Sequence, residues 1–136
     1  MSFDIFFQCI AGEAPGIPRA AVCALFPMVE GSSESDDWSV RYDDKNSCRI
    51  RVTPSKSNPE LITSLCVNRP CGDLRFWESA LAILRMGPVI LYWPGGGPVV
   101  GAESLAAEFP QEIAESLGQP RCVSSAQEIM DAIRAS

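Results

Sequence analysis

The chain has 136 residues, of which 46% are hydrophobic and 21% are charged, a balance typical of one globular domain spanning residues 1–136. Its formal charge is −6, and only two of its 11 basic residues, Lys45 and Lys56, are lysines. This balance argues against nucleic acid or an anionic membrane as partner, because both are bound by clustered Lys and Arg.

The N-terminal half predicts a strand, a short helix and then three more strands. Phe6 lies on the more polar face of the first strand, which favours an interior position in a sheet. A loop at 11–17, rich in Gly and Pro, leads to a helix with Pro18 in its first turn. The expected elements are a strand at 3–10, a helix at 20–26, a hairpin at 38–42 and 48–53, and a strand at 61–67.

The next segment predicts the most regular helix of the chain. Its apolar stripe has helical spacing and consists of Leu74, Trp77, Ala80, Leu81, Ile83 and Leu84. Asp73 is a suitable N-cap residue, and Gly87 is a suitable C′ residue. An apolar strand at 88–93 follows, then a turn at 94–98, after which Val99 and Val100 continue the pairing.

The C-terminal third is predicted to be helical, since apolar residues recur every four positions from Leu105 to Leu117. Pro110 divides this segment into two pieces, and Gly118 ends the second. A short strand at 121–123 precedes a last helix, opened by a capping box of Ser125 and Glu128. The fold class is therefore α+β, in the order β-α-β-β-β-α-β-α-β-α, with helices packed on a mainly antiparallel sheet.

The residue types available for chemistry are limited, because the chain contains no histidine. This removes the commonest general base and metal ligand, so we expect no enzyme activity, no metal and no cofactor.

The six cysteines form no CxxC motif and no spacing typical of small secreted proteins, which favours buried free thiols in a reducing cytoplasm. Cys66 and Cys71 are near enough in sequence to pair. Cys71, ahead of a helix, has either a depressed pKa or a buried structural role.

An acidic cluster is the first candidate site. Its residues are expected to form a partner-binding surface and are Glu34, Asp36, Asp37, Trp38, Asp43 and Asp44. Such a surface fits a partner with a basic surface, and an aromatic beside charges is a usual hot-spot composition. A solvated loop, with Trp38 as core anchor of its strand, is the other interpretation.

The glycine run after the strand at 88–93 is the second candidate. Gly95, Gly96 and Gly97 could present backbone N–H groups to a phosphate, with Arg69 as a further anion ligand. However, neither a Walker motif nor a dinucleotide fingerprint is present. A simple strand-to-strand turn that needs positive φ is the alternative.

A group of small bacterial proteins of unassigned function resembles this chain in the segments Met1–Gln8, Gly12–Glu13, Asn68–Cys71 before Trp77, and Leu91–Pro94. Small acidic proteins of this kind resemble, in type, the immunity proteins that neutralise toxins delivered between bacteria. This resemblance implies a cytoplasmic protein that binds a cognate toxin and occludes its active site. Immunity proteins share no single fold or motif, so no residue role is carried over. The alternatives are a small enzyme or a nucleotide-binding domain using the glycine run, and a structural homo-oligomer using the 88–93 strand at a sheet edge.

Overall fold

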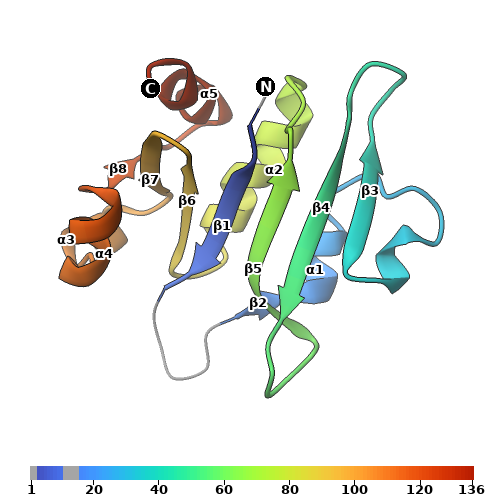
Figure 1. Cartoon of the computed structure of the whole chain (residues 1–136), viewed down its shortest axis with the longest axis horizontal. Coiled ribbons are helices and arrows are strands. Elements are labelled where there is room, and N and C mark those ends of the chain that lie inside the picture. Colours follow the sequence, from blue (N-terminus) through green and yellow to red (C-terminus); the bar gives the residue numbers. More distant parts are fainter. Residues whose placement is uncertain (1–2, 11–15) are drawn as a thin grey trace.

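An eight-stranded sheet forms the centre of the computed structural model, which describes residues 3–10 and 16–136 (Figure 1). Its strands are β1 (Ile5–Cys9), β2 (Ile17–Pro18), β3 (Asp37–Arg41), β4 (Ser47–Pro54), β5 (Leu61–Asn68), β6 (Val89–Trp93), β7 (Gly96–Val100) and β8 (Arg121–Cys122). The order is β3-β4-β5-β1-β6-β7-β8, with β2 paired to β5. Only the β7–β8 pair is parallel among the described strands, so the predicted α+β class with a mainly antiparallel sheet is confirmed.

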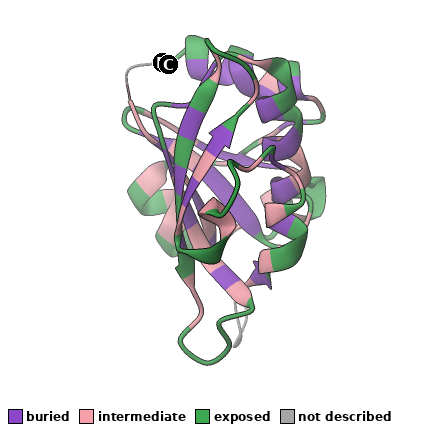
Figure 2. Cartoon of the chain, turned by 90° about the vertical axis from the view of Figure 1, so that its right-hand side faces the viewer, coloured by how far each residue is buried: buried purple, intermediate pink, exposed green. Residues whose placement is uncertain are grey.

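Helices cover both faces of this sheet, but to different extents. They are α1 (Arg19–Cys23), α2 (Leu74–Leu84), α3 (Glu103–Ala107), α4 (Gln111–Leu117) and α5 (Ala126–Arg134), with a 3₁₀ turn η1 (Ser32–Glu34). Figure 2 shows helices with buried residues on one side of the sheet and a helix without them on the other. The inner face, under α1, α2 and α5, therefore holds the main core.

The alternation of side chains along each strand explains why the two faces differ. In β4, Ile50 and Val52 are buried on the inner face, whereas Arg49 and Arg51 are exposed on the outer face. The β1 strand lies between β5 and β6, which confirms the interior position predicted from Phe6. Phe6 itself stacks on Tyr92 across the outer face, with ring centroids 5.3 Å apart.

Two helices differ from their predicted limits. Pro18 is the N-cap of α1 rather than its first residue, because it still pairs with Leu61 in the sheet. The α1 helix ends at Cys23, three residues before the predicted end. The α2 helix ends at Leu84 with Arg85 as its C-cap, so the C′ position falls on Met86 rather than on Gly87 as predicted, because the last turn closes with shorter-range bonds such as Met86 N–H to Ile83 O.

The apolar stripe of α2 is shifted from the predicted one. Leu74 was expected in the stripe, but it is 47% exposed, because it lies in the first turn beyond the edge of the core. Phe76 takes its place and is fully buried beside Trp77. Asp73 is confirmed as the N-cap, since its carboxylate accepts the Arg75 backbone N–H at 2.9 Å.

The capping box of α5 is also modified. Ser125 Oγ accepts the backbone N–H of Glu128 at 3.1 Å, as predicted. The Glu128 carboxylate, however, accepts from the backbone N–H and hydroxyl of Ser124, one residue before the expected donor. The helix start is thus correctly predicted, and its second hydrogen bond is displaced by one residue.

The sheet edges and interior bear on two of the sequence-based alternatives. The 88–93 strand, β6, lies between β1 and β7, so it is not available for edge pairing with another copy. At the β3 edge, the segment at 27–29 is hydrogen-bonded to β3: one of its backbone N–H groups donates to Ser39 O, and Pro27 O accepts from the Arg41 backbone N–H.

Among the described residues, none of the helices has both the length and the apolar character that crossing a membrane requires. Part of the predicted loop (residues 11–15) and of the resemblance (Met1–Ser2, Gly12–Glu13) lies outside the described residues.

Candidate functional site

Most of the predicted acidic cluster is paired with arginines. Asp36 accepts from Arg19 at 2.8 Å, Asp37 pairs with Arg49, and Asp44 pairs with Arg41. Glu34, in η1, is exposed and has no ion pair within residues 3–10 and 16–136. These contacts are exposed and contribute little stability, but they remove most of the negative potential that the sequence suggests.

The cluster is also divided between the two ends of β3. Glu34, Asp36 and Asp37 lie at the start of the strand, whereas Asp43 and Asp44 lie in the turn after it. Asp43 has a structural role in that turn, where its carboxylate accepts the backbone N–H groups of Lys45 and Asn46, both at 2.9 Å. Hydrogen bonds from the Asn46 side chain and these N–H groups lower the pKa of Asp43.

Trp38 lies in the core rather than on this surface. Its side chain is fully buried, and its Nε1–H donates to Ser35 O at 3.0 Å. The Arg19 guanidinium lies 5.6 Å from the ring centroid and links the tryptophan to Asp36. Trp38 thus has the second role that the sequence allowed, the core anchor of its strand, and it offers no ring to a partner.

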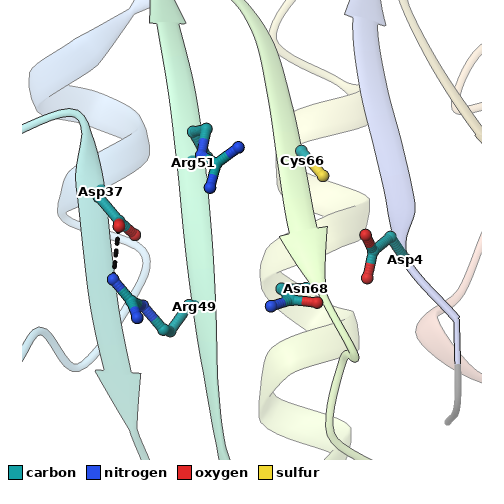
Figure 3. Close-up of a pocket in the computed structure, with 6 residues that line it drawn as sticks. All are labelled: Asp4, Asp37, Arg49, Arg51, Cys66 and Asn68. Atoms are coloured by element: carbon teal, nitrogen blue, oxygen red, sulfur yellow. Dashed lines mark hydrogen bonds and ion pairs between the residues drawn. The ribbon is translucent and has the colours of Figure 1, made fainter.

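A polar pocket of about 160 Å³ opens on the outer face of the sheet. Figure 3 shows its lining residues on four neighbouring segments: Asp4, Asp37, Arg49, Arg51, Cys66 and Asn68. Arg49 is directed toward Asp37, whereas Arg51 has no ion pair in the described part of the chain. Burial raises the pKa of the Cys66 thiol, which keeps it protonated. The two carboxylates balance the two guanidiniums, so the pocket suits a small polar group of no fixed charge.

The three glycines of the run form the turn and the start of the second strand in the β6–β7 hairpin. Gly95 lies in the turn with φ +84°, but Gly96 and Gly97 belong to strand β7. A Cβ at Gly96 would lie 2.2 Å from Trp93 Nε1, and a Cβ at Gly97 would lie 2.8 Å from Tyr92 Cα. The three glycines are therefore explained by close packing and positive φ, as the turn interpretation expects.

Arg69 does not join these glycines. It follows β5, with φ +48°, and its backbone N–H donates to the Asp4 carboxylate at 3.2 Å. Because β1 and β6 separate β5 from β7, three strand spacings, or about 14 Å, lie between the two positions. Within the described residues, no group of three or more His, Cys, Asp or Glu side chains is placed to hold a metal ion.

A different acidic surface lies on α3 and α4. We call it the α3–α4 surface; its acidic residues are Glu103, Glu108, Glu112 and Glu115, and residues 101–118 contain no lysine or arginine. All four glutamates are exposed, and none has an ion pair in the part of the chain that the structure describes. Sequence reasoning treated this segment as a helix and missed its charge, although the run of unopposed glutamates is visible in the sequence.

The α3–α4 surface is also apolar. Leu105, Phe109, Ile113 and Leu117 recur every four residues and are only half-buried, so neither helix has a buried residue. Beneath α4, a groove of about 330 Å³ opens against the outer face of β1 and β6. Its lining is mainly apolar and consists of Gln8, Ile10, Ile90, Tyr92, Glu112, Ile113, Ser116 and Leu117. The surface thus combines an apolar floor with a negative rim.

No family model, curated protein or solved structure matches this chain. A function must therefore be inferred from the surfaces themselves. Of the surfaces described above, the α3–α4 surface combines four glutamates that have no ion pair among the described residues with a mainly apolar groove, whereas arginines pair with most of the acidic residues of the β3 cluster and balance the carboxylates of the polar pocket.

Proposed function

We propose that this protein is a protein-binding module that holds a basic, amphipathic segment of a partner against the α3–α4 surface. The observation that carries the proposal is the meeting of four unpaired glutamates with a half-exposed apolar stripe and groove. Helices with no buried residue gain stability when a partner covers them, because apolar burial contributes about 25 cal/mol per Å².

The two parts of the surface have different expected roles. The glutamates attract a basic partner and raise its association rate, an effect that salt weakens. The groove would accept an apolar side chain between Ile90, Ile113 and Tyr92, and burying one Leu or Phe contributes about 1.5–3 kcal/mol. Charge would therefore set the rate and orientation of binding, and the groove would set much of the affinity.

The finer proposal is that the partner is a toxin and that the protein is its immunity protein. Toxins that act on nucleotides or nucleic acids have basic clefts, and an acidic protein surface is complementary to such a cleft. The net charge of −6 and the resemblance described from the sequence support this role. The acidic residues beside β3 offer a second, competing surface for the same partner.

A paired set of charge reversals distinguishes the two surfaces. The double variant Glu112→Lys with Glu115→Lys changes the α3–α4 surface, and Asp36→Lys with Asp37→Lys changes the β3 surface by the same charge. The probe is a helical Leu/Lys peptide, and its Glu counterpart is the charge control. We expect the first variant to weaken peptide binding about tenfold or more and to reduce its salt dependence, and the second to change it little.

The readout is the Kd from calorimetric titration at two salt concentrations, with circular dichroism as the check on folding. Unchanged affinity in the Glu112/Glu115 variant contradicts the assignment of the binding surface to α3–α4. A loss confined to the Asp36/Asp37 variant moves the surface to β3.

The immunity role needs a separate experiment. The protein is co-expressed with the product of the gene beside its own, and growth is compared with that of cells expressing the neighbour alone. Rescue of growth, lost in the Glu112/Glu115 variant, is the expected result. A neighbour that is harmless, or a toxicity that this protein does not relieve, contradicts the immunity role and leaves the peptide-binding result standing.

A further inference from the structure

Two opposite charges face each other across β5 in the polar pocket on the outer face of the sheet. Arg51 lies on β4 and Asp4 immediately precedes β1, and β5 runs between these two strands. Figure 3 shows the Arg51 guanidinium directed toward β5 from one side and the Asp4 carboxylate directed toward it from the other. Two strand spacings, or about 10 Å, separate the two backbones. The pocket therefore has a positive side and a negative side.

The register of the sheet explains why these side chains share one face. Arg51 is paired with Cys66 in β5, and Cys66 is paired with Phe6 in β1. Because alternate residues of a strand point to the same face, Asp4 lies on the same face as Phe6, and Asn68 lies on the same face as Cys66. Cys66 and Asn68 thus form the floor of the pocket, between its two charged sides.

The charged groups on the two sides of β5 are not neutralised by ion pairs. Asp37 pairs with Arg49 at the β3 side of the pocket, so this arginine is already balanced. The Arg51 side chain has no hydrogen bond and no ion pair within residues 3–10 and 16–136. The Asp4 carboxylate accepts the Arg69 backbone N–H at 3.2 Å and has no ion pair in the same part of the chain. A guanidinium and a carboxylate thus remain available to a ligand.

The floor of the pocket and its negative side are fixed by the backbone. Arg69 has φ +48°, a conformation that residues other than glycine rarely adopt, and its N–H holds the Asp4 carboxylate. The Asn68 side-chain amide, which can both donate and accept, has no hydrogen bond among the described residues. Cys66 is a free thiol that does not pair with Cys71. Because burial raises the pKa of Cys66, its thiol adds no charge to the floor.

These charges select a ligand that carries both signs. An anion would be attracted by Arg51 and repelled by the carboxylates of Asp4 and Asp37. A cation would be attracted by Asp4 and repelled by Arg51 and Arg49. A zwitterion is attracted on both sides and leaves the overall charge balance of the pocket unchanged. A cavity of about 150 Å³ holds a molecule the size of benzene. The pocket, at about 160 Å³, therefore admits only a small zwitterion.

We propose that this pocket binds an α-amino acid with a short side chain. The Arg51 guanidinium donates to the carboxylate of the ligand, and the Asp4 carboxylate accepts from its ammonium group. The Asn68 amide oxygen accepts a second hydrogen bond from the ammonium group. Both charged contacts belong to the stronger, charge-assisted class of hydrogen bond. The pocket shares no lining residue with the groove beneath α4, so the proposal does not depend on the proposed function.

The first experiment titrates L-alanine into the isotope-labelled full chain and follows the backbone amides by NMR, at low salt to limit screening. Two control ligands keep the shape of alanine but lose one charge: isobutyrate has no ammonium group, and 3-methylbutan-2-amine has no carboxylate. We expect saturable shifts at Asp4, Arg51, Cys66 and Asn68 with L-alanine, and binding at least about fivefold weaker for each control. The absence of a saturable shift, shifts confined to another part of the molecule, or equal binding of either control overturns the proposal.

Variants then test the two charged contacts. Arg51→Met removes the guanidinium, and Asp4→Asn removes the negative charge but keeps an oxygen for the Arg69 N–H. Arg134→Met and Glu60→Gln remove the same charges from exposed positions outside the pocket and serve as controls. We expect the two pocket variants to bind L-alanine at least about fivefold more weakly, and the two controls to bind it as the wild-type chain does. Unchanged binding in both pocket variants overturns the proposal. If a pocket variant fails to fold, the comparison of the three ligands on the wild-type chain still decides.

Discussion

At the scale of single residues, Gly95 and Gly97 have similar backbones but different surroundings. Both have positive φ, +84° and +86°. A Cβ at Gly95 would meet nothing within 4 Å, whereas a Cβ at Gly97 would lie 2.8 Å from Tyr92 Cα and 3.0 Å from Leu91 O. We expect Gly95→Ala to cost about 1–2 kcal/mol from the backbone alone. Gly97→Ala should cost more than about 3 kcal/mol, because backbone atoms cannot move aside as a flexible side chain can.

Urea denaturation followed by tryptophan fluorescence measures this difference, with the slope of unfolding as the check on two-state behaviour. Equal losses in the two variants would mean that φ alone determines the need for glycine. The comparison also explains what the sequence could show here. Three consecutive glycines predict a turn with positive φ. Only the structure shows that Gly96 and Gly97 lie in strand β7, packed against Trp93 and Tyr92.

The acidic residues around β3 differ from the glycines, because the sequence alone does not show how much of their charge is balanced. The sequence predicts a negatively charged surface here, but ion pairs offset much of that charge, and the partners of Asp36 and Asp37 lie 17 and 12 residues away along the chain. Arg19 reaches Asp36 from the end of β2, and Arg49 reaches Asp37 across the β3–β4 hairpin. A local window of sequence shows neither contact. Sequence alone also could not exclude Trp38 from the surface, since strand alternation leaves its facing undecided until the neighbours of β3 are known.

At the scale of elements, α2 shows how periodicity can find a helix and still misplace its edge. Leu74 and Phe76 are both apolar, but the first is 47% exposed and the second is fully buried against Trp77 and Phe26. We expect Leu74→Ala to change the free energy of unfolding by less than about 0.5 kcal/mol, as at other exposed sites. Phe76→Ala should cost about 3–5 kcal/mol, because it leaves a cavity in the core.

The two α2 variants are compared by chemical denaturation under the same conditions. Replacing a buried leucine by alanine costs about 2 kcal/mol or more. A loss of that size in Leu74→Ala would therefore place Leu74 in the core after all. The helix, its N-cap and the strands around it were predictable because they depend on local spacing and caps. The strand order was not, because β1 pairs with β5 and β6 through contacts far apart in the chain.

At the scale of the whole molecule, the net charge of −6 is unevenly distributed. Ion pairs hold Asp36 and Asp37 beside β3 and Asp73 at the start of α2, whereas residues 101–118, which form the α3–α4 surface, contain no basic residue to balance the glutamates. The two helices without a buried residue, on one side of the sheet (Figure 2), thus lie in the segment that has four glutamates and no basic residue. Exposed apolar groups and unpaired like charges are both unfavourable in water. A basic amphipathic partner would cover the apolar groups and balance the charges.

The carboxylates that are paired or capped determine how stability should change with pH. Hydrogen bonds from Arg75, Asn46 and Ser124 lower the pKa values of Asp73, Asp43 and Glu128, respectively. Because the folded pKa values lie below the unfolded ones, which are about 3.9–4.3, this stabilisation is complete above the unfolded values. It is lost as the pH falls through the folded values. We therefore expect a melting temperature that is flat between about pH 6 and pH 5 and falls below about pH 4.

The fall in melting temperature below about pH 4 is called the acid limb here. The variant Asp73→Asn tests how much one carboxylate contributes to it. Asparagine still caps a helix, but it cannot form the ion pair with Arg75, so the fall in melting temperature below about pH 4 should be shallower. Glu103→Gln removes the same charge from an exposed position in α3 without an ion pair among the described residues, and its acid limb should match that of the wild-type chain. Scanning calorimetry at closely spaced pH values makes the comparison. Identical limbs in all three proteins would show that the Asp73–Arg75 contact does not contribute to stability, and the charge balance around α2 would then have no thermodynamic consequence.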